Sequence, residues 1–139
     1  MTKDVLVTIS GMQNDIEDTP IELVTVGTYY LKNGKHYVLF DEQVEDGDVV
    51  TKNTVKFHDG HFEIIKRGGA NSFLVFENGK KTSSIYNTLV GPLQIDTLTS
   101  ALNIEESEEK IQVYVKYSLN MNQAFISECE VHFTVQARM

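Results

Sequence analysis

A chain of 139 residues with 41% hydrophobic and 23% charged residues is expected to form a single globular domain over residues 1–139. Twenty acidic against twelve basic residues give a net charge of −8, which argues against nucleic-acid and membrane partners, because both favour basic surfaces. The single cysteine excludes an internal disulfide, and no apolar stretch resembles a signal peptide or a membrane span, so we predict a cytoplasmic protein.

Turn dipeptides recur along the chain, and each tolerates the positive φ angles of tight hairpins. They are Asn33-Gly34, Asp59-Gly60, Gly68-Gly69 and Asn78-Gly79. The segments between them are rich in Val, Ile, Phe, Tyr and Thr, which favour strands, and they lack helical periodicity. The sequence therefore predicts an all-β chain of about ten strands. The expected strands are 3–12, 20–32, 35–44, 51–58, 61–67, 70–77, 80–87, 91–103, 109–119 and 124–137.

The expected hairpin over residues 51–67 has a histidine on each side of Asp59-Gly60. With a two-residue turn, His58 lies opposite His61, and both face solvent. A zinc site needs three or four protein ligands, and only Glu63 is a nearby third candidate, so we predict a turn without a metal. The opposite face then carries the core residues Val55, Phe57, Phe62 and Ile64.

The connection around Gly68-Gly69 leaves two registers open. With a two-residue turn, the apolar side chains of Leu74 and Phe76 point outward beside Ile65. A contiguous exposed apolar patch is typical of an interface, so Ile65, Leu74 and Phe76 are candidates for contact with a partner or a second copy. A bulge or a longer loop would instead return Leu74 and Phe76 to the core.

The last two expected strands each carry alternating apolar residues. Both apolar sets can face the core only if the connection holds an odd number of residues, so we predict a three-residue loop over residues 120–122. Phe125 and Cys129 then lie on the core face. Cys129 is interpreted as a small buried hydrophobe rather than a nucleophile, because no electropositive neighbour is evident.

Motifs of catalysis and cofactor binding are absent from the sequence: there is no GxSxG, HExxH, phosphate loop, dinucleotide fingerprint or CxxC. The acidic stretch 41–48 lacks the ligand spacing of a calcium loop, and we interpret it as a solvated strand end. We therefore predict no catalytic residue, no metal and no cofactor. An enzyme without a visible motif is the third hypothesis for function.

The short hairpins, with SSIYNTLVG at 83–91 followed by LTSALNI at 98–104, resemble the YwiB-like family of small bacterial proteins, whose function is unknown. The likeness covers essentially the whole chain. It implies a calycin-like fold, an up-and-down antiparallel barrel of about 8–10 strands, related in shape to lipocalins and fatty-acid-binding proteins. It carries over no catalytic residue. Positions that look recurrent in the family are Tyr86, Thr88, Gly91 and Thr99.

Such a barrel either encloses a small ligand or is filled by side chains. Our leading hypothesis is a non-enzymatic module that binds a small, partly apolar ligand, because Tyr and Thr are more frequent than a dry core requires. The alternative is an interaction protein, monomeric or homodimeric, with a filled barrel. Tyr29, Tyr30 and Tyr37 cluster across Asn33-Gly34. Cross-strand aromatic packing explains this cluster without a ligand, although tyrosine hydroxyls that face a cavity would give the same pattern. The candidate ligand-binding residues are Tyr29, Lys32, Tyr37, Lys80, Tyr86, Thr88 and Thr99.

Successive loops of an up-and-down barrel alternate between its two ends. The second, fourth and sixth loops therefore share one end, where a basic rim could attract an anionic ligand group. The expected rim contains Lys32, Lys35, His58, His61, Lys80 and Lys81. The opposite end would collect the acidic residues Asp15, Glu17, Asp18, Glu45, Asp46 and Asp48.

Overall fold

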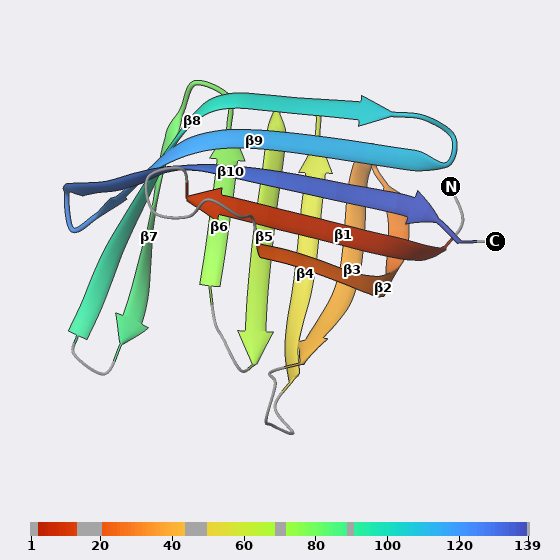
Figure 1. The fold of residues 1–139 in the computed structure, drawn as a ribbon, viewed down its shortest axis with the longest axis horizontal. Coiled ribbons are helices and arrows are strands. Elements are labelled where there is room, and N and C mark those ends of the chain that lie inside the picture. Colours follow the sequence, from red (N-terminus) through yellow and green to blue (C-terminus); the bar gives the residue numbers. More distant parts are fainter. Residues whose placement is uncertain (1–2, 14–20, 44–49, 69–71, 89–90, 139) are drawn as a thin grey trace.

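The computed structural model describes residues 3–13, 21–43, 50–68, 72–88 and 91–138 (Figure 1). These residues form ten antiparallel strands, close to the ten ranges predicted from the sequence. No helix in the described residues is long and apolar enough to cross a membrane. The strands are β1 (Asp4–Gln13), β2 (Ile21–Lys32), β3 (Lys35–Gln43), β4 (Val50–His58), β5 (His61–Gly68), β6 (Ser72–Glu77), β7 (Lys81–Thr88), β8 (Gly91–Glu106), β9 (Lys110–Met121) and β10 (Ala124–Ala137).

All ten strands belong to one sheet in the order β6-β5-β4-β3-β2-β1-β10-β9-β8-β7. Sequential strands are neighbours except β6 and β7, which are the two edges of the sheet, and β1 pairs with β10, so the chain is an up-and-down meander. The two ends of the sheet approach one another around the β6–β7 turn. There the Gly79 amide donates to the Thr99 carbonyl at 2.9 Å, and the Thr82 hydroxyl donates to the Val75 carbonyl at 2.6 Å. The predicted fold class, an antiparallel up-and-down barrel, is confirmed as a nearly closed barrel.

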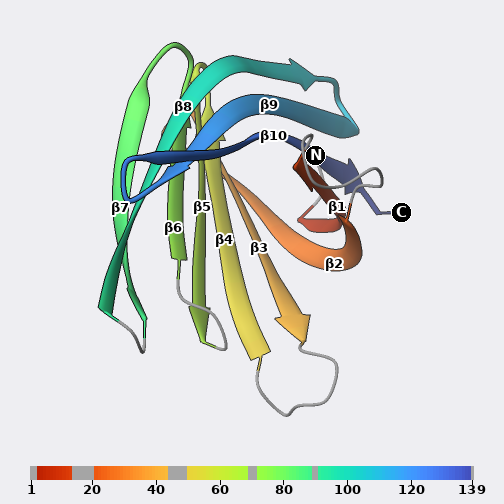
Figure 2. The ribbon, with the colours of Figure 1, turned by 60° about the vertical axis from the view of Figure 1, so that its left-hand side comes forward.

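The barrel is flattened into two layers that cross at a steep angle, with β1, β9 and β10 on one side and β3 to β6 on the other (Figures 1 and 2). Strand β2 belongs to both layers, because it pairs with β1 through Thr28 and with β3 from Thr28 onward. Gly27 lies at this crossing. A Cβ atom at Gly27 would lie only 2.8 Å from the Leu39 carbonyl oxygen, so the close approach of the strands requires glycine.

Aromatic rings from both layers fill the barrel near the β4–β5 turn. Phe57, Phe62 and Phe133 are fully buried, with ring centroids 5.5 to 6.0 Å apart in pairs, and Phe76 packs on Phe62 at 6.2 Å. The β4–β5 register is the one predicted, with His58 opposite His61 and Phe57 opposite Phe62. This end of the barrel is therefore a packed core.

The outward orientation of Leu74 and Phe76 is wrong, and the alternative register is the one observed. Strand β6 pairs Leu74 with Ile64 and Phe76 with Phe62, which places both side chains on the inner face. Phe76 is fully buried and Leu74 packs against the core, so they form no outward-facing patch with Ile65, which is only half-buried. The pairing of Lys66 with Ser72 leaves five residues between them, and this odd number reverses the faces relative to a two-residue turn.

The predicted three-residue loop before β10 is also wrong. The turn contains two residues, Asn122 and Gln123, and both have positive φ angles, of 48° and 70°. A β-bulge between Phe125 and Ser127 supplies the odd residue instead, so that Cys129 still faces the core. Phe125 precedes the bulge and is 61% exposed, contrary to its predicted place in the core.

Candidate ligand-binding pocket

A pocket of about 330 Å³ lies between the two layers at the end of the barrel opposite the aromatic core. We call it the interior pocket. Its walls come from both layers and are mainly apolar, which matches the character of small-molecule sites. The apolar lining consists of Ile9, Gly11, Leu23, Phe40, Ile64, Leu74, Tyr117, Cys129 and Val131, and the polar lining of Ser10, Glu42, Asn53, Lys66 and Glu130.

Three polar side chains from neighbouring strands form one corner of this pocket, and we call Glu42, Asn53 and Lys66 the polar corner. The Lys66 ammonium lies 3.1 Å from Glu42 Oε1. The Asn53 amide group donates to the same oxygen at 3.4 Å and to the Thr51 carbonyl at 3.5 Å, both long distances. Asn53 is only 2% exposed, and its Oδ1 has no hydrogen-bond partner among the described residues.

The polar corner follows from strand alternation. Phe40 and Glu42 are two residues apart on β3, Asn53 and Val55 on β4, and Ile64 and Lys66 on β5, so each polar residue continues an inward-facing row. Asn53 also pairs directly with Lys66. This site was not predicted from the sequence. Polar residues at core-facing positions of three successive strands were the available signal.

Of the seven predicted ligand-binding residues, none of the five whose side chains the structure describes lines the interior pocket. Tyr29 and Thr99 are buried, and the Thr99 hydroxyl has no partner among the described residues. Tyr37 lies instead on the outer face, where the Lys56 ammonium is 5.6 Å from its ring centroid. Lys32 and Lys80 are exposed beside turns. The side chains of Tyr86 and Thr88 lie outside the described residues, although their backbones are paired on β7.

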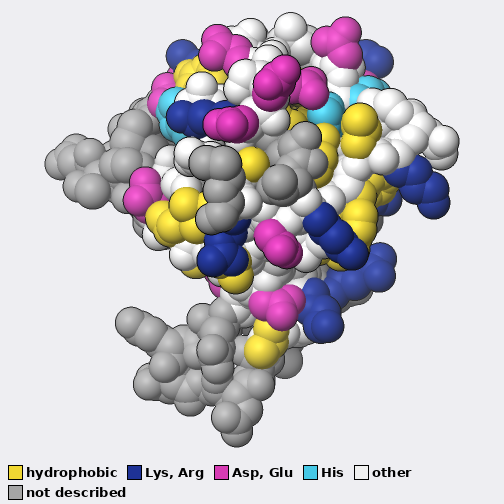
Figure 3. Space-filling view, turned by 90° about the vertical axis from the view of Figure 1, so that its right-hand side faces the viewer, with side chains coloured by type: hydrophobic (Ala, Val, Ile, Leu, Met, Phe, Trp, Pro, Cys, Tyr) yellow, Lys and Arg dark blue, Asp and Glu magenta, His cyan; other side chains and the backbone are white. Residues whose placement is uncertain are grey.

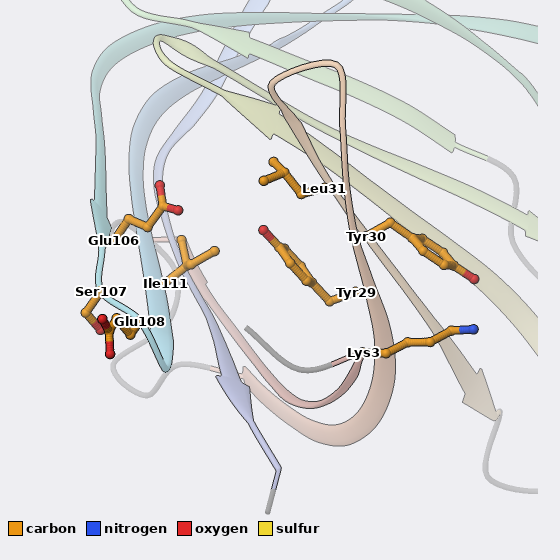
Figure 4. Close-up of a pocket in the computed structure, with 8 residues that line it drawn as sticks. All are labelled: Lys3, Tyr29, Tyr30, Leu31, Glu106, Ser107, Glu108 and Ile111. Carbon is orange, nitrogen blue, oxygen red and sulfur yellow. The ribbon is translucent and has the colours of Figure 1, made fainter.

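A second pocket, of about 480 Å³, lies where the β8–β9 turn approaches β2 (Figure 4). Tyr29, Leu31 and Ile111 provide its apolar walls, and Glu106 and Glu108 its acidic side. In the close-up, Tyr30 and Lys3 point away from the space between Tyr29 and Glu106. Two carboxylates against a single lysine give this pocket little attraction for an anionic group.

Behind that pocket, His36 is buried between Tyr29 and Phe57. The Tyr29 hydroxyl lies 2.6 Å from His36 Nδ1, and the imidazole stacks on the Phe57 ring at 4.7 Å. Glu106 Oε2 lies 3.6 Å from Nε2. Burial lowers the pKa of His36, and the nearby Glu106 carboxylate opposes this effect in part. Burial, followed by Glu106, raises the pKa of Tyr29. This arrangement suits a neutral His36 imidazole whose Nδ1 accepts a hydrogen bond from the Tyr29 hydroxyl.

The second, fourth and sixth loops share one end of the barrel, as predicted. Lys32 pairs with Lys35 beside the first of these turns, and the paired row of His58, His61 and Glu77 connects the other two. In Figure 1, β4 and β6 both run toward this end. The acidic residues expected at the opposite end lie outside the described residues.

Carboxylates match much of the basic charge at the shared end. Lys80 lies 3.0 Å from Glu77, and His61 lies 2.9 Å from Glu63 and 3.2 Å from Glu77. The hydrogen bond from Lys80, with help from His61, lowers the pKa of Glu77. Lys81 lies 3.6 Å from Asp96. Acidic, basic and histidine side chains lie beside one another in the upper part of the face seen in Figure 3.

Potential metal ligands do not cluster in the part of the chain that the structure describes. No group of three or more His, Cys, Asp or Glu side chains has suitable geometry there. His58 and His61 stack on one another with ring centroids 4.9 Å apart. The pair is therefore a stacked surface pair at a turn in this structure.

Comparison with known proteins places this barrel in a family. The model of a family described as a domain of unknown function (DUF1934) matches residues 7–133. The chain belongs to this family. The uncharacterised β-barrel protein YwiB of Bacillus subtilis (strain 168) is 28% identical over 112 residues, which cover 81% of this chain and 78% of YwiB. The resemblance noted in the sequence is thereby confirmed.

The fold of this DUF1934 member is also that of a solved structure. The crystal structure of the ywiB protein from Bacillus subtilis superimposes with a TM-score of 0.81 at 22% identity, over 99% of this chain and 93% of the other. The likeness shows the fold and assigns no ligand. The interior pocket therefore has to be interpreted from its own chemistry.

Proposed function

We propose that this protein is a non-enzymatic binding module that holds one small, partly apolar molecule in the interior pocket. The observation that carries the proposal is the pocket itself: about 330 Å³ of space, walled mainly by apolar side chains from both layers. Small-molecule sites begin at roughly 300 Å³ and combine apolar walls with a few polar groups. The interior pocket has both properties.

The packing of the barrel supports this proposal over the alternative of a completely filled interior. The aromatic cluster occupies only the end near the β4–β5 turn, while the opposite end keeps open space between the layers. The alternative of an interaction protein was based on an exposed apolar patch with Leu74 and Phe76. Phe76 is fully buried and Leu74 packs inward, so these two side chains form no such patch. The expected kinship with lipocalins agrees with a binding role. The buried free thiol of Cys129 supports a reducing compartment such as the cytoplasm.

Native mass spectrometry of the gently purified protein provides the first test, because it reports a retained small molecule and the oligomeric state together. We expect a ligand-bound monomer or homodimer. The stripped protein should then bind a neutral apolar fluorescent probe such as N-phenyl-1-naphthylamine. The probe provides a quantitative readout even if purification removes the natural ligand.

A variant that blocks the pocket tests whether the fluorescent probe binds in the interior pocket. Gly11 lines the pocket, and a Cβ atom there would lie 3.9 Å from the Glu130 carbonyl oxygen, so Gly11→Leu fills space without a clash at the Cβ. We expect it to weaken probe binding at least about tenfold, which corresponds to ~1.4 kcal/mol. Thr8→Leu, an outward position on the same strand, is the matched control. Equal probe binding by the wild type and Gly11→Leu would overturn the proposed function.

A further inference from the structure

A groove on the outside of the barrel opens where β2 leaves β3. Strand β2 pairs with β3 only from Thr28 to Lys32, and its preceding residues pair with β1 instead. Strand β3 continues beside β4 as far as Gln43, so β2 and β3 diverge (Figure 2). A space of about 590 Å³ lies at this divergence, and we call it the outer groove.

Both arginines of the chain line the outer groove, together with one lysine. Lys52 and Arg67 lie directly opposite one another on β4 and β5, and both side chains are exposed. Arg138 reaches the same groove from the residue that follows β10. Like charges directly opposite one another destabilise a sheet. An anion bound between Lys52 and Arg67 would replace this repulsion with two attractions.

These three cations differ from other bases of the protein in having no carboxylate partner. Three lysines elsewhere each lie within 3.6 Å of a carboxylate, whereas no described side chain forms an ion pair with Lys52, Arg67 or Arg138. Asp4 and Asp41 also line the groove, so three cations stand against two carboxylates. Asp41 flanks Lys52 from β3 and Arg67 flanks it from β5, so this acid lies on the far side of Lys52 from Arg67.

The chemistry of the paired cations selects a type of anion. A guanidinium group offers two parallel N–H donors to the oxygens of a phosphate or a carboxylate, and an ammonium group beside it adds a further donor. A phosphate monoester carries a charge of about −1.5 to −2 at neutral pH, which matches Lys52 and Arg67 together, whereas a carboxylate matches only one of them. The net charge of −8 disfavours a long polyanion such as nucleic acid.

We propose that the outer groove binds a small phosphorylated molecule, whose phosphate group is held between Lys52 and Arg67. Val26 and Leu39 also line the groove and are 53% and 39% exposed, so they provide apolar surface for the organic part of the ligand. Arg138 adds attraction from the side of β10. The inference goes beyond the proposed function, because it concerns a second site and holds whether or not the interior pocket is occupied.

A probe series with one aromatic ring tests the phosphate group. Phenyl phosphate, benzoate and phenol are titrated at slightly alkaline pH and low salt into the ¹⁵N-labelled full-length protein, with the backbone amides of β4 and β5 as reporters. We expect phenyl phosphate to bind roughly three- to tenfold more tightly than benzoate, and phenol to bind more weakly than either. Added sodium chloride should weaken phenyl phosphate binding, because the site is exposed to solvent.

Substitutions of the two cations test the position of the site. Arg67→Gln and Lys52→Gln should each weaken phenyl phosphate binding about three- to tenfold. Arg67→Lys keeps the charge without the two parallel donors and should give an intermediate affinity. Lys35→Gln removes one exposed positive charge beside the β2–β3 turn and should leave the affinity unchanged. Without ligand, Arg67→Gln should unfold in urea at the wild-type midpoint or above it, since the repulsion from Lys52 is removed.

The outcomes separate this site from the interior pocket. Equal affinity for phenyl phosphate and benzoate, equal losses in Lys35→Gln and Arg67→Gln, or no saturable shift of the β4 and β5 amides would overturn the phosphate site. Gly11→Leu blocks the interior pocket and should leave phenyl phosphate binding unchanged. Loss of phenyl phosphate binding in Gly11→Leu would place the compound in the interior pocket and would also overturn the inference, while supporting the proposed function.

Discussion

At the scale of single residues, Phe62 is the centre of the packed end of the barrel. Its fully buried ring lies within 6.2 Å of three other phenylalanine rings, measured between centroids. We expect Phe62→Ala to reduce the free energy of unfolding by about 3–5 kcal/mol, because it leaves a cavity among rigid rings. Glu63→Ala, the next residue but on the outer face, should cost less than about 1 kcal/mol. Urea denaturation measures both, and similar losses would contradict the assigned faces.

His36 should make the stability of the protein depend on pH. Burial lowers its pKa below the ordinary value of 6.5, so the unfolded chain binds a proton more readily than the folded protein. The contribution of His36 to the free energy of unfolding should therefore be greatest above about pH 6.5. It should be lost as the pH falls through the lowered pKa of His36 in the folded protein.

Denaturation at several pH values between 5 and 8 tests this dependence. His36→Leu should show a smaller loss on acidification than the wild type, whatever its absolute stability. His132→Leu, at an exposed position on β10, should retain the wild-type dependence. Parallel curves for the wild type and His36→Leu would contradict the prediction.

The histidine pair at the β4–β5 turn should not bind zinc tightly. Both nitrogens of His61 already face carboxylates, Nε2 at 2.9 Å from Glu63 and Nδ1 at 3.2 Å from Glu77, and the ring stacks on His58. Isothermal titration calorimetry is expected to show no submicromolar site. Such a site, if it disappeared on His58→Ala, would show that the pair is a ligand set.

At the scale of secondary-structure elements, the β9–β10 hairpin contains a correctable strain. Gln123 adopts a φ of 70°, which is unfavourable for a residue with a Cβ, whereas the Asn122 side chain accepts a bond from the Gln94 amide at 3.0 Å and should be kept. We expect Gln123→Gly to raise the free energy of unfolding by about 0.5–1 kcal/mol.

A glycine control separates relief of this strain from a general effect of glycine. Gln112→Gly, at an exposed position within β9, should lower stability by about 0.5–1 kcal/mol, because glycine is unfavourable inside a strand. Thermal denaturation monitored by circular dichroism is sufficient for the comparison. A loss of stability in both variants would contradict the assigned turn conformation.

At the scale of the whole molecule, β2 determines how the two layers enclose the pocket. It passes from the layer of β1 to the layer of β3 at Gly27, where an added Cβ would lie 2.8 Å from the Leu39 carbonyl oxygen and 2.9 Å from Val7 Cγ2. We expect Gly27→Ala to reduce the free energy of unfolding by about 1–3 kcal/mol through overpacking.

The matched control is Gly11→Ala on the neighbouring strand, where the nearest atom to an added Cβ is 3.9 Å away. It should leave stability unchanged or slightly increased. Urea denaturation compares the two variants directly. Equal stability of Gly27→Ala and the wild type would mean that the layers can separate at β2 without cost.

Much of this fold could be predicted from the sequence because its signals are local. Asn33-Gly34, Asp59-Gly60 and Asn78-Gly79 mark three turns, and alternation assigns Phe57 and Phe62 to the core face. Predictions failed where a single unpaired residue changed the alternation. The β10 bulge exposes Phe125, and the connection from β5 to β6 turns Phe76 inward. One additional residue exchanges the faces of a strand at little local cost, so the sequence pattern cannot detect it.

The sequence by itself determined the strands, their order as successive hairpins and the family, because turn propensity and side-chain alternation act between residues that are close in the chain. Only the tertiary structure decided which inward-facing positions are packed and which line a space. Asn53 and Phe57 occupy equivalent inward positions on β4, yet Phe57 is enclosed by rings from the opposite layer and Asn53 lines the interior pocket. The physical reason is that the distance between the layers depends on how β2 crosses at Gly27 and how β10 and β1 lie over β3 to β6. These contacts join residues far apart in the chain, and local propensity carries no information about them.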